Sequence, residues 1–239
     1  MALLTEEGWL FLLRWIHFLS GITWIGILYY FNFVQTPFFA TAEAPVRSGM
    51  IVGGLVSRAL WWFRWGAMFT FLSGWLIILH MMGRAGLRGF FDNSYGWAIF
   101  FGGMLGSLMW FNVWFVIWPA QQVVIASATQ VSKGGQAIAE AAARGKRAGF
   151  TSRTNTMLSI PMLFFMGAAK HLTIFSQTTP GSKIGALILL AVVMVFAEWN
   201  ALVGTAGSGK KMLSTLKGAF WGGFILTAIL YVGLELLFP

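Results

Sequence analysis

The sequence predicts an all-α integral membrane protein, a polytopic bundle of about six transmembrane helices. Three observations predict this class: 58% of the 239 residues are hydrophobic, only 10% are charged, and the mean hydropathy is +0.75. Soluble domains have about 45–50% apolar and about 25% charged residues. Because each span uses about 20 residues, the spans and short loops account for residues 1–239 as a single helical membrane domain.

Six continuous apolar runs are long enough to cross a hydrocarbon core of roughly 30 Å as helices. Their continuity differs from the alternating pattern of a membrane β-barrel. A stretch at residues 136–148 is rich in alanine and carries several charges, which predicts a short amphipathic helix on the cytoplasmic lipid surface. The six apolar runs cover residues 9–33, 59–82, 97–118, 155–175, 184–203 and 218–238.

The distribution of basic residues predicts the orientation of the bundle. An even number of spans places both termini on one side, and eleven of the sixteen lysines and arginines then lie on the opposite side. Such an excess marks the cytoplasmic side, so both termini are expected outside. The net charge of +9 follows from this bias, and no nucleic-acid binding is expected. The eleven residues are Arg47, Arg58, Arg64, Lys133, Arg144, Lys146, Arg147, Arg153, Lys210, Lys211 and Lys217.

Three histidines, His17, His80 and His171, are the main candidate functional residues. Imidazole is costly in hydrocarbon and is a common metal ligand. The predicted topology places all three toward the external face, on three different helices. The sequence has no cysteine, which excludes disulfides, iron–sulfur clusters and covalent haem attachment. We therefore expect non-covalent haem b, with the number of haems and the axial pairing left open.

Two other interpretations of the histidines compete with haem ligation. A zinc or copper site would favour close local spacing or a carboxylate partner, which histidines on three separate helices do not offer. Each histidine could also serve as a hydrogen-bonded structural residue.

Small and basic residues beside the histidines favour a haem site. Gly21 lies one turn after His17 and Gly167 lies one turn before His171, so each glycine predicts a shallow notch for a flat macrocycle. Arg14, one turn from His17, is predicted to pair with a haem propionate. The alternatives are ordinary helix packing for the glycines and snorkelling to the headgroups for the arginine.

Glu198, in the fifth apolar run, is a carboxylate within a predicted membrane helix. Such a residue indicates either a proton relay or a protonated group that bridges helices. Asn112 invites the same two interpretations, with interhelical hydrogen bonding favoured. Glu198 and the positive loops are the only features that favour a small-molecule transporter.

The chain carries three distinctive segments: LRWIHFLSGITWIGILYYFNFVQ at 13–35, NVWFVIWP at 112–119, and SRTNTMLSIPMLFFM from 152, closing at His171. They resemble the membrane domain of bacterial membrane-bound urate oxidase (urate hydroxylase), as does EWN at 198–200 more weakly. That family joins a helical membrane domain to a C-terminal cytochrome c domain outside the membrane. Oxidation of urate to 5-hydroxyisourate feeds electrons to the respiratory chain. The first segment also resembles small helical membrane proteins that include bacterial protoporphyrinogen oxidase, which implies b-type haem.

With the histidines, the resemblance predicts a b-type-haem-binding redox protein of the bacterial inner membrane, and the distribution of basic residues places both termini in the periplasm. The 239 residues contain no cytochrome c domain, so we expect electrons to pass to a separate periplasmic or membrane cytochrome or another respiratory partner. Urate oxidase-like oxidoreductase activity is implied by the family alone. The alternative is an accessory structural subunit of a larger respiratory or photosynthetic membrane complex.

Overall fold

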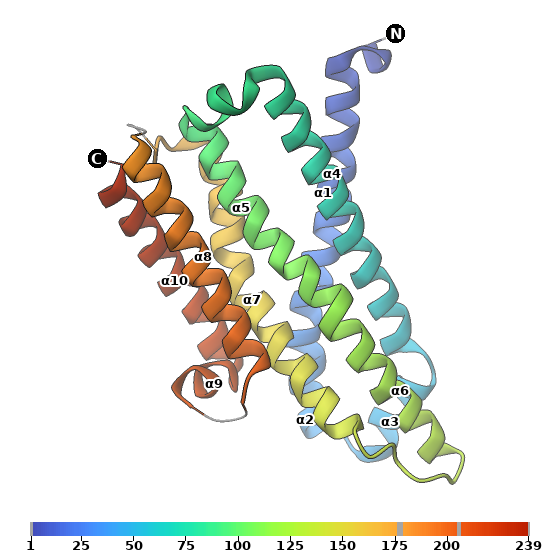
Figure 1. The fold of residues 1–239 in the computed structure, drawn as a ribbon. Helices are drawn as coiled ribbons and strands as arrows, with labels where there is room; N and C mark the ends of the chain where they lie inside the picture. The colour runs from blue at the N-terminus through green and yellow to red at the C-terminus, as the bar shows by residue number, and fades with distance from the viewer. Residues whose placement is uncertain (1, 176–178, 205–206, 239) are drawn as a thin grey trace.

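The computed structural model describes residues 2–175, 179–204 and 207–238. Every regular element in these ranges is helical, and the long helices form one elongated bundle (Figure 1). The all-α prediction is confirmed for this part of the chain. The elements are a 3-10 turn at Ala2–Leu4, α1 (Glu6–Tyr29), the π-helical η2 (Tyr30–Gln35), α2 (Thr36–Thr41), α3 (Ala44–Val52), α4 (Leu55–Phe91), α5 (Ser94–Phe111), the π-helical η3 (Asn112–Ile117), α6 (Trp118–Ser132), α7 (Ala141–His171), α8 (Pro180–Leu202), α9 (Ser208–Leu213) and α10 (Leu216–Leu237).

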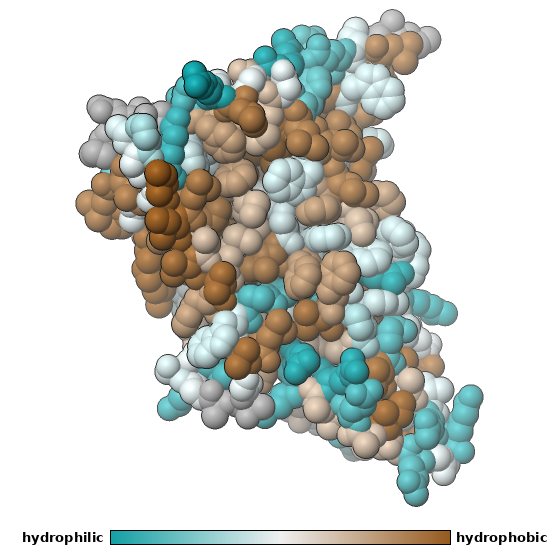
Figure 2. Space-filling model, viewed as in Figure 1, coloured by the Kyte–Doolittle hydropathy of each residue, from teal (hydrophilic) through white to brown (hydrophobic). Residues whose placement is uncertain are grey.

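Five helical stretches among the described residues are long and apolar enough to cross a membrane. Many large apolar side chains on their outer faces are exposed, as lipid contact requires. Figure 2 shows apolar side chains over α8 and α10, with hydrophilic side chains gathered mainly at the two ends of the bundle. These features identify a membrane protein. The five stretches are Glu6–Thr41, Leu55–Phe91, Ser94–Ser132, Pro180–Leu202 and Leu216–Leu237.

The remaining long helix, α7, contains most of the predicted span at 155–175 but is more polar than the other five. It lies inside the bundle, where it contacts α5, α6, α8 and α10. Its polar side chains therefore face other helices instead of lipid. The low hydropathy of α7 reflects this central position in the bundle. Five of these polar residues are completely buried: Thr151, Thr154, Asn155, Thr156 and Ser159.

Two of the long helices contain a π-helical segment close to a proline. The backbone N–H of Thr36 bonds to Phe31 O in η2, and that of Trp118 bonds to Val113 O in η3, so each bond spans five residues. Pro37 and Pro119 follow directly. Proline supplies no N–H to the carbonyl four residues earlier, which favours this local widening. Each π segment carries one buried asparagine, Asn32 or Asn112.

The stretch at 136–148 differs from its prediction. Residues 136–138 are not helical, and Ala141 begins α7, which continues without a break to His171. Two glycines interrupt the chain before it, and Gly134 has a φ of 82°. From Ala141 onward the residues are mostly good helix formers, so the polar stretch forms the first turns of α7 instead of a separate surface helix.

Both termini lie at the same end of the bundle, with α3, α9 and the connection between α6 and α7 at the opposite end (Figure 1). This end also carries the start of α4 and of α7. The eleven basic residues of the predicted cytoplasmic side belong to these elements or adjoin them. The structure therefore separates the basic residues as the sequence predicts, while the side of the membrane that they face remains a proposal.

Glycines allow close helix contacts at several points. A Cβ at Gly66 of α4 would lie 3.1 Å from the backbone nitrogen of Trp24 in α1, and one at Gly223 of α10 would lie 2.7 Å from Met157 O in α7. The α1 helix lies mainly against α4, and only three of its residues, Gly8, Trp24 and Leu28, are buried. The α1–α4 pair therefore forms one flank of the bundle, and α7 forms the centre.

Candidate functional site

His17 is held in a defined orientation between α1 and α4. Its Nδ1 lies 2.9 Å from Thr70 O and 3.2 Å from Ser73 Oγ. Because a carbonyl oxygen can only accept, Nδ1 carries the proton and donates it to Thr70 O. Nε2 then keeps a free lone pair, and it has no hydrogen-bond partner among the described residues. An imidazole oriented through Nδ1 in this way is prepared to bind a metal through Nε2.

The notch beside His17 is formed by Gly74 of α4. A Cβ at Gly74 would lie 2.9 Å from His17 Cε1 and 3.3 Å from Nδ1. The imidazole ring therefore occupies the space that a larger residue would fill. Gly21, which we expected to form this notch, instead faces Thr70, with its Cβ position 3.8 Å from the Thr70 methyl carbon.

The other two histidines lie elsewhere. His80 Nε2 is 2.8 Å from Glu6 Oε1, and Arg84 binds the same carboxylate oxygen at 3.0 Å. His80 is six residues beyond Gly74 on α4, or about 9 Å along the helix axis. His171 is exposed at the end of α7. All three histidines belong to the half of the bundle that carries the termini, and their axial pairing on a haem stays a prediction.

Gly167, the predicted notch for His171, has open space beside it, with no other group within 4 Å of its Cβ position. Among the residues that the structure describes, no group of three histidines, aspartates or glutamates could hold a metal ion. The histidines therefore do not form a shared zinc or copper site in this part of the chain.

Residues from three other helices lie near Tyr95 at the start of α5. The Tyr95 hydroxyl donates to Met81 Sδ of α4 at 3.6 Å, and Lys170 Nζ of α7 lies 5.0 Å from the centre of its ring. Arg14 of α1 is close enough for its charge to act on Tyr95. Two cations therefore stand near one tyrosine, on the same half of the bundle as His17. A ligand with carboxylate groups would find both cations here.

A polar cluster lies at the centre of the bundle, where the two π segments meet α7. Asn155 is completely buried, and its Nδ2 donates to Met109 O at 2.9 Å. Its Oδ1 accepts from Asn112 Nδ2, also at 2.9 Å. Asn32 likewise donates to Ser152 Oγ at 2.8 Å. These bonds confirm the interhelical role expected of Asn112, and they connect η2 and η3 to the same helix.

Glu198 of α8 adjoins this cluster. Its carboxyl group lies beside the Asn112 amide. Both Glu198 oxygens are buried without a hydrogen-bond partner among the described residues, and so is Asn112 Oδ1. Glu198 of α8 and Asn112 of η3 are therefore neighbours, and the choice between a proton relay and a bridge stays a prediction.

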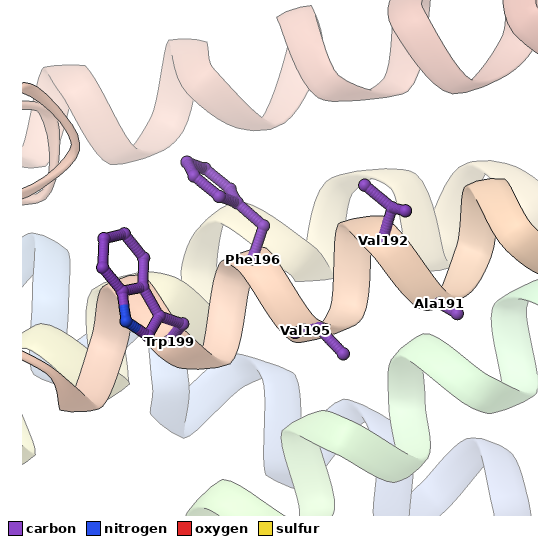
Figure 3. A pocket seen from close by; sticks show the side chains of 5 residues that line it. All are labelled: Ala191, Val192, Val195, Phe196 and Trp199. Atoms are coloured by element: carbon purple, nitrogen blue, oxygen red, sulfur yellow. The ribbon is translucent and has the colours of Figure 1, made fainter.

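Two surface depressions of the bundle are lined almost entirely by apolar groups. One is lined by a single face of α8, with Val192, Phe196 and Trp199 among its residues (Figure 3). Another runs beside α5, where Phe71 stacks on Trp110 with ring centres 4.0 Å apart. Neither has the polar groups that orient a polar substrate, and both suit contact with lipid.

Sequence analysis did not identify Thr70, Gly74, Tyr95 and Lys170 as parts of a site. Their contacts with α1 and with one another join segments that are far apart in the sequence, such as His17 and Thr70, separated by 53 residues. Gly74 carries the only local signal, since a glycine inside an apolar helix indicates a close approach by another group.

Comparison with protein families matches residues 88–205 to a model described as urate oxidase N-terminal. The match covers α5 to α8, including the segments at 112–119 and 152–171 and the residues Glu198 to Asn200. His171 lies within it, whereas His17 and His80 precede it. Neither the curated proteins nor the solved structures contain a match to this chain.

Proposed function

We propose that the chain is a haem-binding membrane domain of a urate oxidase-like redox system, because residues 88–205 match the family model described as urate oxidase N-terminal, in agreement with the resemblance. His17 is the observation that carries this proposal. Its Nδ1 is fixed by Thr70 O, while Nε2 is left free in the half of the bundle with the termini. Axial histidine ligands of haem are commonly oriented by such a bond to the second ring nitrogen.

The residues present fit one axial histidine per haem. His17 offers a free Nε2, whereas His80 Nε2 is engaged by Glu6. Arg14 and Lys170 are the candidates to hold the propionates, since both stand near Tyr95. Haem supplies one-electron chemistry when it is bound. The contribution of this chain is then to orient His17, to neutralise the propionates and to exclude water.

Urate is the electron donor in this proposal, supported by the family match, and a separate cytochrome is the acceptor. The test is the visible spectrum of the purified chain, reduced minus oxidised, followed by pyridine extraction to identify the haem. A b-type difference spectrum with haem b in the extract is the expected result. A chain that binds no haem when it is produced with haem available would contradict the proposal.

The second candidate is an accessory structural subunit of a larger membrane complex. It is favoured by α1, because the rest of the chain covers little of the surface of this helix. Trp9, Phe18 and Ile22 are 60%, 68% and 72% exposed. Co-purification with other membrane subunits from the native membrane, together with a spectrum free of haem, would favour this candidate.

We also propose that α7 is a sixth span, with both termini in the periplasm of a bacterial inner membrane. Because the chain has no cysteine, single cysteines can report each end of α7. In right-side-out vesicles, an impermeant maleimide should label Leu172→Cys, just after α7, but leave Lys146→Cys unlabelled until the membrane is opened. The unsubstituted chain is the background control. Labelling of both cysteines from one side would contradict a spanning α7, and the reverse pattern would invert the orientation.

A further inference from the structure

The direction of the hydrogen bonds in the central polar cluster is fixed by one backbone carbonyl. Met109 O can only accept, so the amide of Asn155 must present Nδ2 to it at 2.9 Å. Asn155 Oδ1 then faces Asn112 and accepts from its Nδ2. Asn112 is therefore oriented as well, with one N–H committed to Asn155. Its Oδ1 and its second N–H are left for another partner.

That partner is Glu198. The two side chains are neighbours, yet three oxygen atoms at this point, Asn112 Oδ1 and both carboxyl oxygens, are buried and lack a donor among the described residues. All three are acceptors when the carboxyl group is ionised. The second Asn112 N–H can serve only one of them. Two buried acceptors therefore remain without a donor when the carboxyl group is ionised.

The charged groups on the neighbouring elements have other contacts. The Arg64 guanidinium of α4 lies over the rings of Trp114 and Trp118, 4.8 and 3.9 Å from their centres. Lys210 of α9 donates to Ala201 O at 2.9 Å, and Arg153 of α7 donates to Leu213 O and Ser214 O, each at 3.0 Å. The segment α5–η3 contains no lysine, arginine or histidine, and Glu198 forms no ion pair within the described part of the chain. An ionised carboxylate here would be an unpaired charge in a membrane bundle, which is strongly disfavoured.

We propose that Glu198 is a proton-binding site inside the membrane, which carries its proton at neutral pH. The carboxyl O–H donates to Asn112 Oδ1, and its carbonyl oxygen accepts the second Asn112 N–H, so that acid and amide form a cyclic pair. Protonation turns one carboxyl oxygen into a donor, so each of the three oxygen atoms has a partner and no unpaired charge remains. Met194, one turn earlier on α8, lines the apolar depression beside α5 with Leu108 and Phe111, which places this side of α8 toward the end of α5, directly before Asn112. The inference does not depend on haem binding.

Infrared spectroscopy of the full chain in lipid vesicles tests the proposal. Glu198 should contribute a carbonyl band of a protonated carboxyl group at neutral pH, where an ordinary glutamate is ionised. The band should move in D₂O and be lost in Glu198→Gln. Glu140→Gln is the matched control, because Glu140 is exposed and paired with Arg144 at 3.1 Å, so this change should leave the band unaltered.

Glu198→Gln keeps a hydrogen-bonding partner for Asn112, so it should fold with a melting temperature close to that of the unsubstituted chain. If it does not fold, Asn112→Leu gives a second measurement: the Glu198 band should move to the higher frequency of a carbonyl group that has lost its hydrogen bond. Identical infrared spectra for the unsubstituted chain and folded Glu198→Gln would overturn the proposal, as would an unmoved band in Asn112→Leu.

Discussion

His17→Ala is expected to abolish the b-type haem spectrum of the purified chain, while His80→Ala and His171→Ala keep it. Only His17 combines a fixed ring orientation with a free Nε2, since His80 is engaged by Glu6 and His171 is exposed at a helix end. Reduced-minus-oxidised spectra and the ratio of haem to protein measure the effect. Equal haem content in His17→Ala and the unsubstituted chain would show that His17 is not a haem ligand.

Gly74→Ala tests the same site without changing the ligand. A Cβ at this position would lie 2.9 Å from His17 Cε1, so the ring must move and its bond to Thr70 O must weaken. Loss of such an orienting bond typically weakens metal binding by about 10-fold to 100-fold. We therefore expect haem occupancy to fall in a haem titration. Gly83→Ala is the matched control on α4, because nothing lies within 4 Å of its Cβ position. Similar titrations for the two variants would indicate that Gly74 only packs helices.

The helices could be predicted from the sequence because hydrocarbon contact requires long apolar runs. Their ends could not, because helices continue beyond the membrane where polar residues favour them. The predicted run ending at 118 continues as α6 to Ser132, and the run beginning at 155 is preceded by helix from Ala141. Hydropathy measures where the chain can meet lipid, whereas backbone hydrogen bonds and the glycines at 134–135 determine where these helices stop.

The candidate site was predictable only in part. A histidine within an apolar run can be recognised from the sequence as a candidate functional residue, and this is how His17 was identified. Its surroundings depend on how α1 packs on α4, and that register is set by many small contacts, such as Trp24 against Gly66. Gly21 and Gly74 look alike in the sequence, yet only Gly74 lies against the imidazole.

The central cluster shows why polar residues in a membrane helix are hard to interpret from sequence. Asn155 could have capped a helix at the membrane edge, but it lies in the middle of α7 and is completely buried. Asn155 is stable there because it bonds to Asn112 of η3 and to Met109 O of α5. No local sequence pattern predicts these two partners. Asn112 is the first residue of η3, and its Nδ2 donates to Asn155 Oδ1 at 2.9 Å.

Asn155→Leu is expected to cause a large loss of stability. The change removes the bonds of Asn155 to Asn112 Nδ2 and Met109 O, each 2.9 Å long, and leaves both groups buried. Interhelical hydrogen bonds in membranes average about 0.6 kcal/mol. A buried group left unsatisfied adds about 1–3 kcal/mol. We expect a loss of about 2 kcal/mol in the free energy of unfolding, measured by titration from mild detergent into dodecyl sulfate.

Thr156→Val is the matched control for this experiment. Thr156 is equally buried on the same helix, but its hydroxyl bonds only to Ser152 O of α7 itself, at 3.1 Å, so its loss should change stability much less. The double variant Asn112→Leu with Asn155→Leu should be less destabilised than the sum of the two single changes, because both partners of one bond are then removed. Additive effects, or equal losses in Asn155→Leu and Thr156→Val, would show that the amide pair does not connect η3 to α7 energetically.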